Sequence, residues 1–125
     1  MEFGVSVLYL GTETVRGEPA HRIELKRPAR GSRPTDALLE KASRVVVSLS
    51  ATSFLPLKVL HFRFSERDAT ASLLLNDYLS DFRRVGVLLV PFRVEEFVEE
   101  QHLFTMRSDS VQLNVHLSDA DFSTQ

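Results

Sequence analysis

The sequence contains neither cysteine nor tryptophan. Without cysteine, a disulfide scaffold, a thiolate metal site, thiol redox chemistry and cysteine catalysis are all excluded. Glycine and proline occur only five times each among 125 residues, which argues against a fibrous or low-complexity chain. The rest of the composition, 43% hydrophobic and 26% charged, is that of an ordinary globular domain.

A strong charge of one sign is also missing. The 15 basic and 17 acidic residues give a net charge of −2 at pH 7. This balance gives no electrostatic reason to expect nucleic acid or an anionic membrane as the main partner. The local basic group of Arg27, Arg30 and Arg33 has no aromatic residues interleaved, so it does not indicate a nucleic-acid platform either.

No leader and no long apolar run can be recognised. The N-terminus has no basic region, and Glu13 and Arg16 follow its short apolar stretch, so it does not predict a signal peptide. The longest uncharged run, residues 45–57, is too short and too polar to span a bilayer. We therefore expect one soluble domain over residues 1–125. It either stays in the cytoplasm or is a piece of a longer exported precursor.

The dominant pattern is an alternation of apolar and polar residues, which predicts β-strands. It is clearest in residues 21–26, 44–51, 87–98 and 111–118. Turn-forming residues separate the runs at 16–19, 28–34, 53–56, 65–68, 85–87 and 99–101. About eight strands with short connections predict an antiparallel meander, because crossover helices have no room. One short helix is expected at residues 35–42, with Thr35 as its N-cap.

Two further features concern the later strands. Residues 73–82 favour a strand that ends in a turn over a helix. Phe104 and Met106 are even-numbered, whereas Val111, Leu113 and Val115 are odd, so one regular strand cannot bury both sets on one face. We expect a β-bulge near residues 108–110, or a strand that crosses between two environments.

No catalytic signature is present: the sequence has no H-E-x-x-H pair, no G-x-S-x-G elbow and no Gly-rich phosphate loop. Glu99, Glu100 and His102 form the densest group of ligand-type residues. Their side chains alternate between the faces of a strand, so a solvated hairpin tip is favoured over a metal site. We expect no metal and no cofactor.

Two acidic groups are candidate sites. Asp77 and Asp81 could do acid–base work if their environments separated their pKa values. Because Arg83 and Arg84 follow at once, simple charge pairing is favoured. Residues 118–121 resemble a calcium loop faintly but lack the spacing, glycine and glutamate of an EF-hand, so a turn is favoured there.

The middle strands are unusual because they carry apolar residues on both faces. A sheet that is apolar on both faces needs a cover on both, and this chain has little helix to supply it. The pattern alone favours a sandwich or closed barrel that covers itself. The alternative is a curved sheet whose concave face holds an apolar ligand or a partner segment.

The second half of the sequence resembles the outer-membrane lipoprotein-sorting superfamily of LolA-like periplasmic carriers. The resemblance lies in the order of four segments, residues 55–59, 75–87, 90–94 and 111–122. They carry a leucine–proline pair, a tyrosine followed by a phenylalanine–arginine pair and a bend glycine, a proline, and a closing asparagine–aspartate–phenylalanine series. The family usually has a polar residue before the bend glycine, where this chain has Val85.

The resemblance implies a mainly β fold, an open half-barrel made by a curved antiparallel sheet with at most one short helix. Its concave face would bind a lipid or acyl chain without covalent chemistry, and its location would be periplasmic or in the cell envelope. The chain would be the C-terminal part of a longer domain whose helices supply the second cover. The candidate ligand-lining residues are Leu60, Phe62, Phe64, Leu88, Val90, Phe92 and Val94.

Three hypotheses of function follow. The first is a non-enzymatic, carrier-like domain for an apolar small molecule or lipid chain. The second is a protein–protein interaction module that forms a homodimer, or pairs with another segment, through the face or edge of its apolar sheet. The third is an enzyme, which would require Asp77, Asp81 and a histidine to meet in one pocket.

Overall fold

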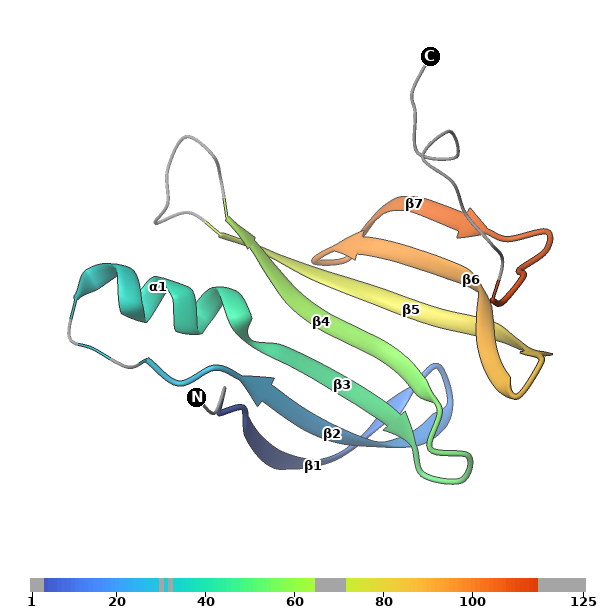
Figure 1. The fold of residues 1–125 in the computed structure, drawn as a ribbon, viewed down its shortest axis with the longest axis horizontal. Coiled ribbons are helices and arrows are strands. Elements are labelled where there is room, and N and C mark those ends of the chain that lie inside the picture. The colour runs from blue at the N-terminus through green and yellow to red at the C-terminus, as the bar shows by residue number, and fades with distance from the viewer. Residues whose placement is uncertain (1–3, 30, 32, 65–71, 115–125) are drawn as a thin grey trace, which may run out of the picture.

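The computed structural model describes residues 4–29, 31, 33–64 and 72–114. Within these residues the chain forms one antiparallel sheet of seven strands and one short helix, as expected for a mainly β fold (Figure 1). The elements in chain order are β1 (Ser6–Val15), β2 (Glu18–Lys26), α1 (Pro34–Ser43), β3 (Val45–Ser50), β4 (Pro56–Phe64), β5 (Ser72–Val85), β6 (Leu88–Val98) and β7 (Gln101–Arg107).

The sheet is a simple meander in which each strand pairs with the next one along the chain. The predicted turns at residues 16–19, 85–87 and 99–101 are confirmed, since β1, β5 and β6 end there and the next strands begin. The expected eighth strand is not found: residues 111–114 are not in a strand, and residues 115–118 lie outside the described part of the chain. The predicted turn at 65–68 also lies outside it.

The fifth strand is longer than predicted. It runs through the expected end near residue 82 to Val85 and stays paired with β6 over almost its whole length. Asp81 has a positive φ of 53°, which an aspartate tolerates better than most residues. The turn chemistry of this segment therefore bends the strand without ending it.

The helix α1 confirms the predicted short helix and extends it by one residue at each end, but its N-cap is Arg33 and not Thr35, which lies inside the first turn. Pro34 stands in the first turn, where its missing N–H costs nothing. Asp36 accepts a hydrogen bond from the backbone N–H of Arg33 at 3.2 Å and so satisfies the helix start. Lys41 in the last turn complements the negative end of the helix dipole.

The register shifts in β1–β2, in β3–β4 and in β6–β7, and none of these β-bulges lies near residues 108–110, where one was expected. Glu96 pairs with Phe104 and Phe97 pairs with His102, which leaves Leu103 as the extra residue of β7. The chain leaves the sheet after Arg107, so residues 108–110 belong to no strand and need no bulge. Leaving the sheet, rather than a register shift, separates the even-numbered from the odd-numbered apolar residues.

Each strand side chain can be assigned to one face of the sheet, because directly paired residues share a face and neighbours along a strand alternate. One face carries α1, whose Lys41 Nζ lies 5.4 Å from the ring centroid of Phe62. We call this the helix-side face and the opposite one the far face. On the helix-side face Val15, Ala20 and Val46 are buried and form the tightest packing around β1–β3.

In the described residues, α1 is the single helix and no helix combines the length and apolar character needed to cross a membrane.

Candidate functional site

The helix-side face is filled by ion pairs where β1–β4 meet. Glu13 is the centre of one group: its carboxylate lies 2.8 Å from Arg22 Nε and 3.4 Å from Lys58 Nζ. It also accepts a hydrogen bond from Ser48 Oγ at 3.1 Å. These contacts join side chains of four neighbouring strands on the helix-side face. The group therefore helps to fix how β1–β4 are aligned with one another.

A second ionic group connects the sheet to the helix. Arg44 Nε donates a hydrogen bond to Glu24 at 2.8 Å, and this guanidinium lowers the pKa of the Glu24 carboxyl below its usual value. Lys26 Nζ lies 3.2 Å from Glu40 of α1. Glu40 also accepts a hydrogen bond from the backbone N–H of Ala29, which together with Lys26 lowers its pKa.

The sheet curves toward the helix-side face at the end that carries the β1–β2 turn. Arg16 in that turn reaches Glu95 on β6, with Arg16 Nη1 2.9 Å from Glu95 Oε1. The same guanidinium lies 4.2 Å from the ring centroid of Tyr78 on β5. The concave side is therefore the helix-side face here, and charged groups occupy it.

The predicted ligand-lining residues do not form one surface. Leu60 pairs with Asn76, and Asn76 pairs with Phe97, so Leu60 lies on the same face as Phe97. Val94 stands three positions before Phe97 on β6 and therefore lies on the opposite face. Leu60, Phe62 and Phe64 belong to the helix-side face, whereas the far face carries Leu88, Val90, Phe92 and Val94.

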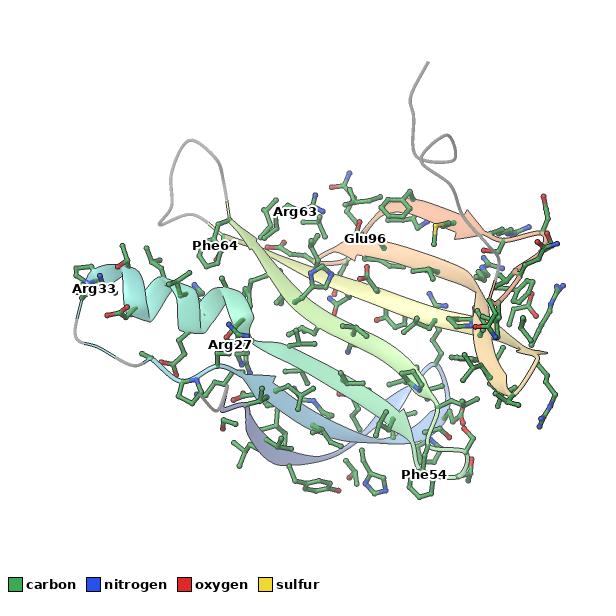
Figure 2. All side chains as sticks on the ribbon, in the orientation of Figure 1. Arg27, Arg33, Phe54, Arg63, Phe64 and Glu96 are labelled. Atoms are coloured by element: carbon green, nitrogen blue, oxygen red, sulfur yellow. The ribbon has the colours of Figure 1, made fainter. Side chains whose placement is uncertain are left out.

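The two groups also differ in what covers them. Phe62 and Phe64 lie under Lys41 of α1, whose Nζ is 5.4 and 5.8 Å from their ring centroids. Figure 2 shows Phe64 at the end of β4 nearest to α1. On the far face Phe92 is buried, while Val90 and Val94 are half-buried. The sequence pattern identified these residues as apolar strand positions. It did not give the register between the strands, which places them on opposite faces.

The far face carries rows of apolar residues on β1–β4 and further apolar residues on β5–β7. Cross-strand partners on it form a row that runs from β1 through β4, made by Tyr9, Ile23, Val47 and Val59. The next row adds Val7, Leu25 and Val45. Most of these side chains are half-buried by their neighbours in the sheet alone, while Val7 and Tyr9 are 67% and 55% exposed. The far-face residues on β5–β7 include Leu75, Leu79, Val94, Val98, Phe104 and Met106.

One polar cluster interrupts this apolar face. It consists of His61 on β4, Asp77 on β5 and Glu96 on β6, and we call it the His–Asp–Glu cluster. His61 Nε2 lies 2.8 Å from Asp77 Oδ2 and 3.8 Å from Glu96 Oε1. Glu96 is only 6% exposed, and Figure 2 labels it on β6.

The electrostatics of the cluster are dominated by Glu96. Burial, followed by the nearby Asp77 carboxylate, raises the pKa of Glu96 above its usual value. Arg63 and His61 act in the opposite direction. A buried carboxyl that faces a second carboxylate is unfavourable when charged, so the site favours a proton or another cation beside Glu96.

The sequence did not reveal this cluster. The three residues stand 16 and 19 positions apart, and only the pairing of β4 with β5 and of β5 with β6 brings them together. The sequence does show that each of the three strands has a polar residue at a position where the alternation predicts an apolar one. That these three positions lie on the same face becomes clear only when the register of the strands is known.

The enzyme hypothesis required Asp77, Asp81 and a histidine in one pocket. The structure joins Asp77 to His61, but Asp81 instead binds Arg83, with Oδ2 2.8 Å from Arg83 Nη2. That pairing was expected for Asp81, and it lowers the pKa of its carboxyl. The predicted charge pairing of Asp77 with arginine is replaced by its contact with His61.

The other sequence candidates are placed as follows. Glu99 and Glu100 form the exposed β6–β7 turn, and His102 Nε2 lies 2.8 Å from Thr105 Oγ1. Residues 118–121 and Arg30 lie outside the described residues. Arg33 binds Asp36, and its neighbour in the basic group, Arg27, lines the same depression as Arg33 beside α1.

That depression has a volume of 580 Å³ and lies between the β2–α1 connection and the helix. It mixes charged residues with small apolar ones, so it does not offer the continuous apolar wall that a lipid chain requires. Its lining includes Arg27, Pro28, Ala29, Arg33, Leu39 and Glu40.

Comparisons with known proteins identify the fold. No protein-family model and no curated protein matches the sequence. Among solved structures, the chain is similar to an outer membrane lipoprotein-sorting protein domain from Vibrio parahaemolyticus, with 12% identity, a TM-score of 0.52 and coverage of 88% of this chain and 45% of that one. It is also similar to a LolA superfamily protein from Nitrosomonas europaea, with 15% identity, a TM-score of 0.51 and coverage of 96% and 49%.

A third similar structure is a DUF1329 family protein from Desulfovibrio piger, with 19% identity, a TM-score of 0.60 and coverage of 95% of this chain and 45% of that one. The chain thus spans about half the length of the solved structures it matches. The expected resemblance is confirmed at the level of fold: the sheet is similar to about half of a lipoprotein-sorting domain and of a LolA superfamily protein.

Proposed function

We propose that the protein binds an apolar ligand, a lipid or acyl chain, on its far face and carries out no chemistry on it. The observation that carries this proposal is the apolar part of the far face on β1–β4, from Tyr9 to Val59, which no element of the described residues covers in the way that α1 covers Phe62 and Phe64. Large exposed apolar surfaces mark binding sites in folded proteins.

The far face replaces the concave face as the proposed binding surface. The charged pairs of Glu13 and Arg16 occupy the concave helix-side face. An apolar chain laid there would break these pairs without replacing them, and uncompensated charges are costly. The far face offers apolar contact along the row from Tyr9 to Val59.

The energetic requirement is modest. Each buried CH₂ group contributes about 0.8 kcal/mol, so an acyl chain of about ten carbons supplies roughly 8 kcal/mol before the cost of association. This predicts weak to moderate affinity and low head-group selectivity. Such behaviour suits a carrier, which must release what it binds.

The fold likeness supports the same proposal. The chain resembles about half of a lipoprotein-sorting domain and of a LolA superfamily protein. We infer a carrier-like role and a periplasmic or cell-envelope location, where such lipids are exchanged. Fractionation of cells that express the full gene with a C-terminal tag tests the location, and a wholly cytoplasmic signal contradicts it.

Native mass spectrometry combined with organic extraction of the purified protein tests the ligand. We expect co-purified lipid or fatty acid, and saturable binding of a fluorescent fatty acid such as cis-parinaric acid after delipidation. Absence of both an extracted apolar molecule and saturable probe binding would reject the proposal.

A homodimer that pairs through the apolar sheet is the second candidate. It is favoured by β7, an edge strand in which every residue is exposed. Phe104 and Met106 project from this strand onto the far face and are 48% and 54% exposed. An unpaired edge with an apolar row beside it is a template for pairing with a second copy. Sedimentation analysis distinguishes the dimer from the lipid-binding monomer, because a protein that stays monomeric at high concentration excludes the dimer.

A further inference from the structure

We propose that the His–Asp–Glu cluster is a binding site for one first-row divalent cation of the Zn²⁺ type. The cluster stands on three adjacent strands at the middle of the sheet. His61, Asp77 and Glu96 present their donor atoms on the far face, all within 4.8 Å of one another.

The sheet itself fixes this geometry. Asp77 and Glu96 are direct cross-strand partners of β5 and β6, so their side chains leave the sheet in parallel. His61 pairs with Leu75, which is two positions from Asp77, so the imidazole approaches Asp77 diagonally. Strand side chains in such positions lie within reach of one another. Ligands that stand on a paired sheet are held more rigidly than ligands on loops.

The separations between donor atoms fit a metal ion. Zinc binds imidazole nitrogen and carboxylate oxygen at about 2.0–2.2 Å, so two ligands of a tetrahedral ion lie roughly 3.3–3.5 Å apart. His61 Nε2 is 2.8 Å from Asp77 Oδ2 and 3.8 Å from Glu96 Oε1, values on either side of that separation. A bound ion therefore requires side-chain rotations that bring all three atoms to a common centre.

The charge of the cluster independently points to a cation. Glu96 is buried to more than nine tenths and faces the Asp77 carboxylate. Its Oε1 lies 3.8 Å from His61 Nε2, too far for a hydrogen bond, and the Asp77 carboxylate stands directly opposite it on β5. Arg63, the nearby cation, is exposed, so its charge is screened by solvent. A divalent ion would satisfy both carboxylates at once.

The donor set selects the type of ion. One imidazole and two carboxylates suit Zn²⁺, Mn²⁺ or Fe²⁺, whereas Mg²⁺ and Ca²⁺ prefer oxygen ligands alone. Three protein ligands leave coordination positions open toward the far face, as in metal sites that keep water or a small ligand. The proposal does not depend on lipid binding, since it rests on the cluster alone.

Equilibrium dialysis of the delipidated chain against Zn²⁺, followed by metal analysis, tests the site. We expect one Zn²⁺ per chain, and a rise in melting temperature of about 10 °C at 100-fold excess over the dissociation constant. The variants His61→Ala, Asp77→Asn and Glu96→Gln should each weaken binding at least tenfold. The matched control is His21→Ala, a far-face histidine that contacts Tyr9 and lies outside the cluster, and it should leave binding unchanged.

Histidine ring NMR on the unmodified chain provides a readout that does not depend on any variant folding. Addition of Zn²⁺ should shift the ring signals of His61 and leave those of His102 in place. Absence of stoichiometric binding, binding that survives His61→Ala, or displacement of Zn²⁺ by equimolar Mg²⁺ would each overturn the proposal. Loss of fatty-acid binding with Zn²⁺ binding intact would reject the proposed function and leave the metal site standing.

Discussion

Arg16 and Glu95 form an ion pair of 2.9 Å between residues that are 79 positions apart in the sequence. The pair joins the β1–β2 turn to β6 across the helix-side face, and Arg16 also lies over the ring of Tyr78. This contact ties the first hairpin of the meander to its later strands.

Replacement of Arg16 by alanine should lower the free energy of unfolding by about 1 kcal/mol, because it removes an ion pair and a cation–π contact at a half-exposed site. Urea denaturation followed by circular dichroism measures the change. Arg84→Ala is the control, since Arg84 is exposed and has no ion pair among the described residues. Equal losses in the two variants would contradict the role of Arg16.

The contribution of the Arg16–Glu95 ion pair to the free energy of unfolding should also depend on pH. The guanidinium holds the pKa of the Glu95 carboxyl below its usual value. The stabilisation is then fully present above the unfolded pKa of about 4.3 and is lost as the pH falls through the lower folded pKa. The stability difference between the wild type and Arg16→Ala should shrink from pH 7 to pH 3. A constant difference would show that packing alone accounts for it.

Glu96→Gln should stabilise the chain at pH 7 when a chelator is present. The folded pKa of Glu96 is raised, so the folded state binds the proton more tightly and stability falls as the pH rises through that pKa. Asp77, His61 and Arg63 face the same carboxyl and set the size of the effect. Thermal melts in EDTA at pH 4 and pH 7 should show a gain only at pH 7.

In saturating Zn²⁺ at pH 7 the wild type should have a higher melting temperature than Glu96→Gln, the reverse of the order in EDTA. The reason is that only the wild type keeps both carboxylate ligands. Asp81→Asn is the matched control, since Asp81 binds Arg83 outside the cluster. A Glu96→Gln variant that is less stable than the wild type in EDTA would mean that the ionised carboxylate is already well paired.

Val47→Lys should weaken fatty-acid binding about tenfold or more, since it places a charge in the middle of the far-face row. Val47 is half-buried, so the lysine can extend to solvent and the sheet can form. Leu8→Lys makes the same kind of change on the helix-side face, where Leu8 pairs with Glu24, and should have little effect. Titration of cis-parinaric acid fluorescence compares them, and equal affinities would place the ligand elsewhere.

Gly17→Ala should cost about 1–2 kcal/mol of stability. Gly17 closes the β1–β2 turn with a φ of +85°, a conformation that a residue with a Cβ atom adopts only under strain. Gly4→Ala is the control, because a Cβ atom there meets nothing within 4 Å and its φ is not in the positive range. Chemical denaturation of both variants measures the difference, and similar stabilities would contradict this account of the turn.

Phe104→Lys should abolish any self-association of the chain. It places a charge in the exposed apolar row of β7, and charged residues protect sheet edges from pairing. Sedimentation velocity over a concentration series provides the measurement. Phe54→Lys, at an exposed position of the β3–β4 turn, should leave the behaviour of the wild type unchanged. A dimer that persists in Phe104→Lys must use another surface.

Much of the fold could be predicted from local signals. Alternating apolar residues located the strands, and turn residues such as Gly17 and Gly86 located the hairpins, because both effects act over a few residues. The helix was predicted from Thr35, Asp36 and the residues that follow them for the same reason. The predicted position of the bulge was wrong, and the described part of the expected eighth strand, residues 111–114, is not in a strand, since both depend on where the chain leaves the sheet after Arg107.

The candidate site was predicted less well. The family resemblance implied that apolar residues of β4 and β6 line one surface, yet Phe62 and Val94 lie on opposite faces. Alternation assigns relative faces within one strand, but it does not say which face of one strand matches which face of the next. The register between neighbouring strands decides which faces match. When both faces of the strands are apolar, the sequence pattern does not determine that register.

The sequence by itself determined that this protein is a meander of antiparallel strands without cysteine chemistry, with more apolar surface than one short helix can cover. Only the tertiary structure decided which surface is charged and which is apolar. It also brought His61, Asp77 and Glu96 within 4.8 Å of one another. The physical reason is that strand formation follows from local alternation, whereas the meeting of side chains from three strands follows from hydrogen-bond register over long sequence separations.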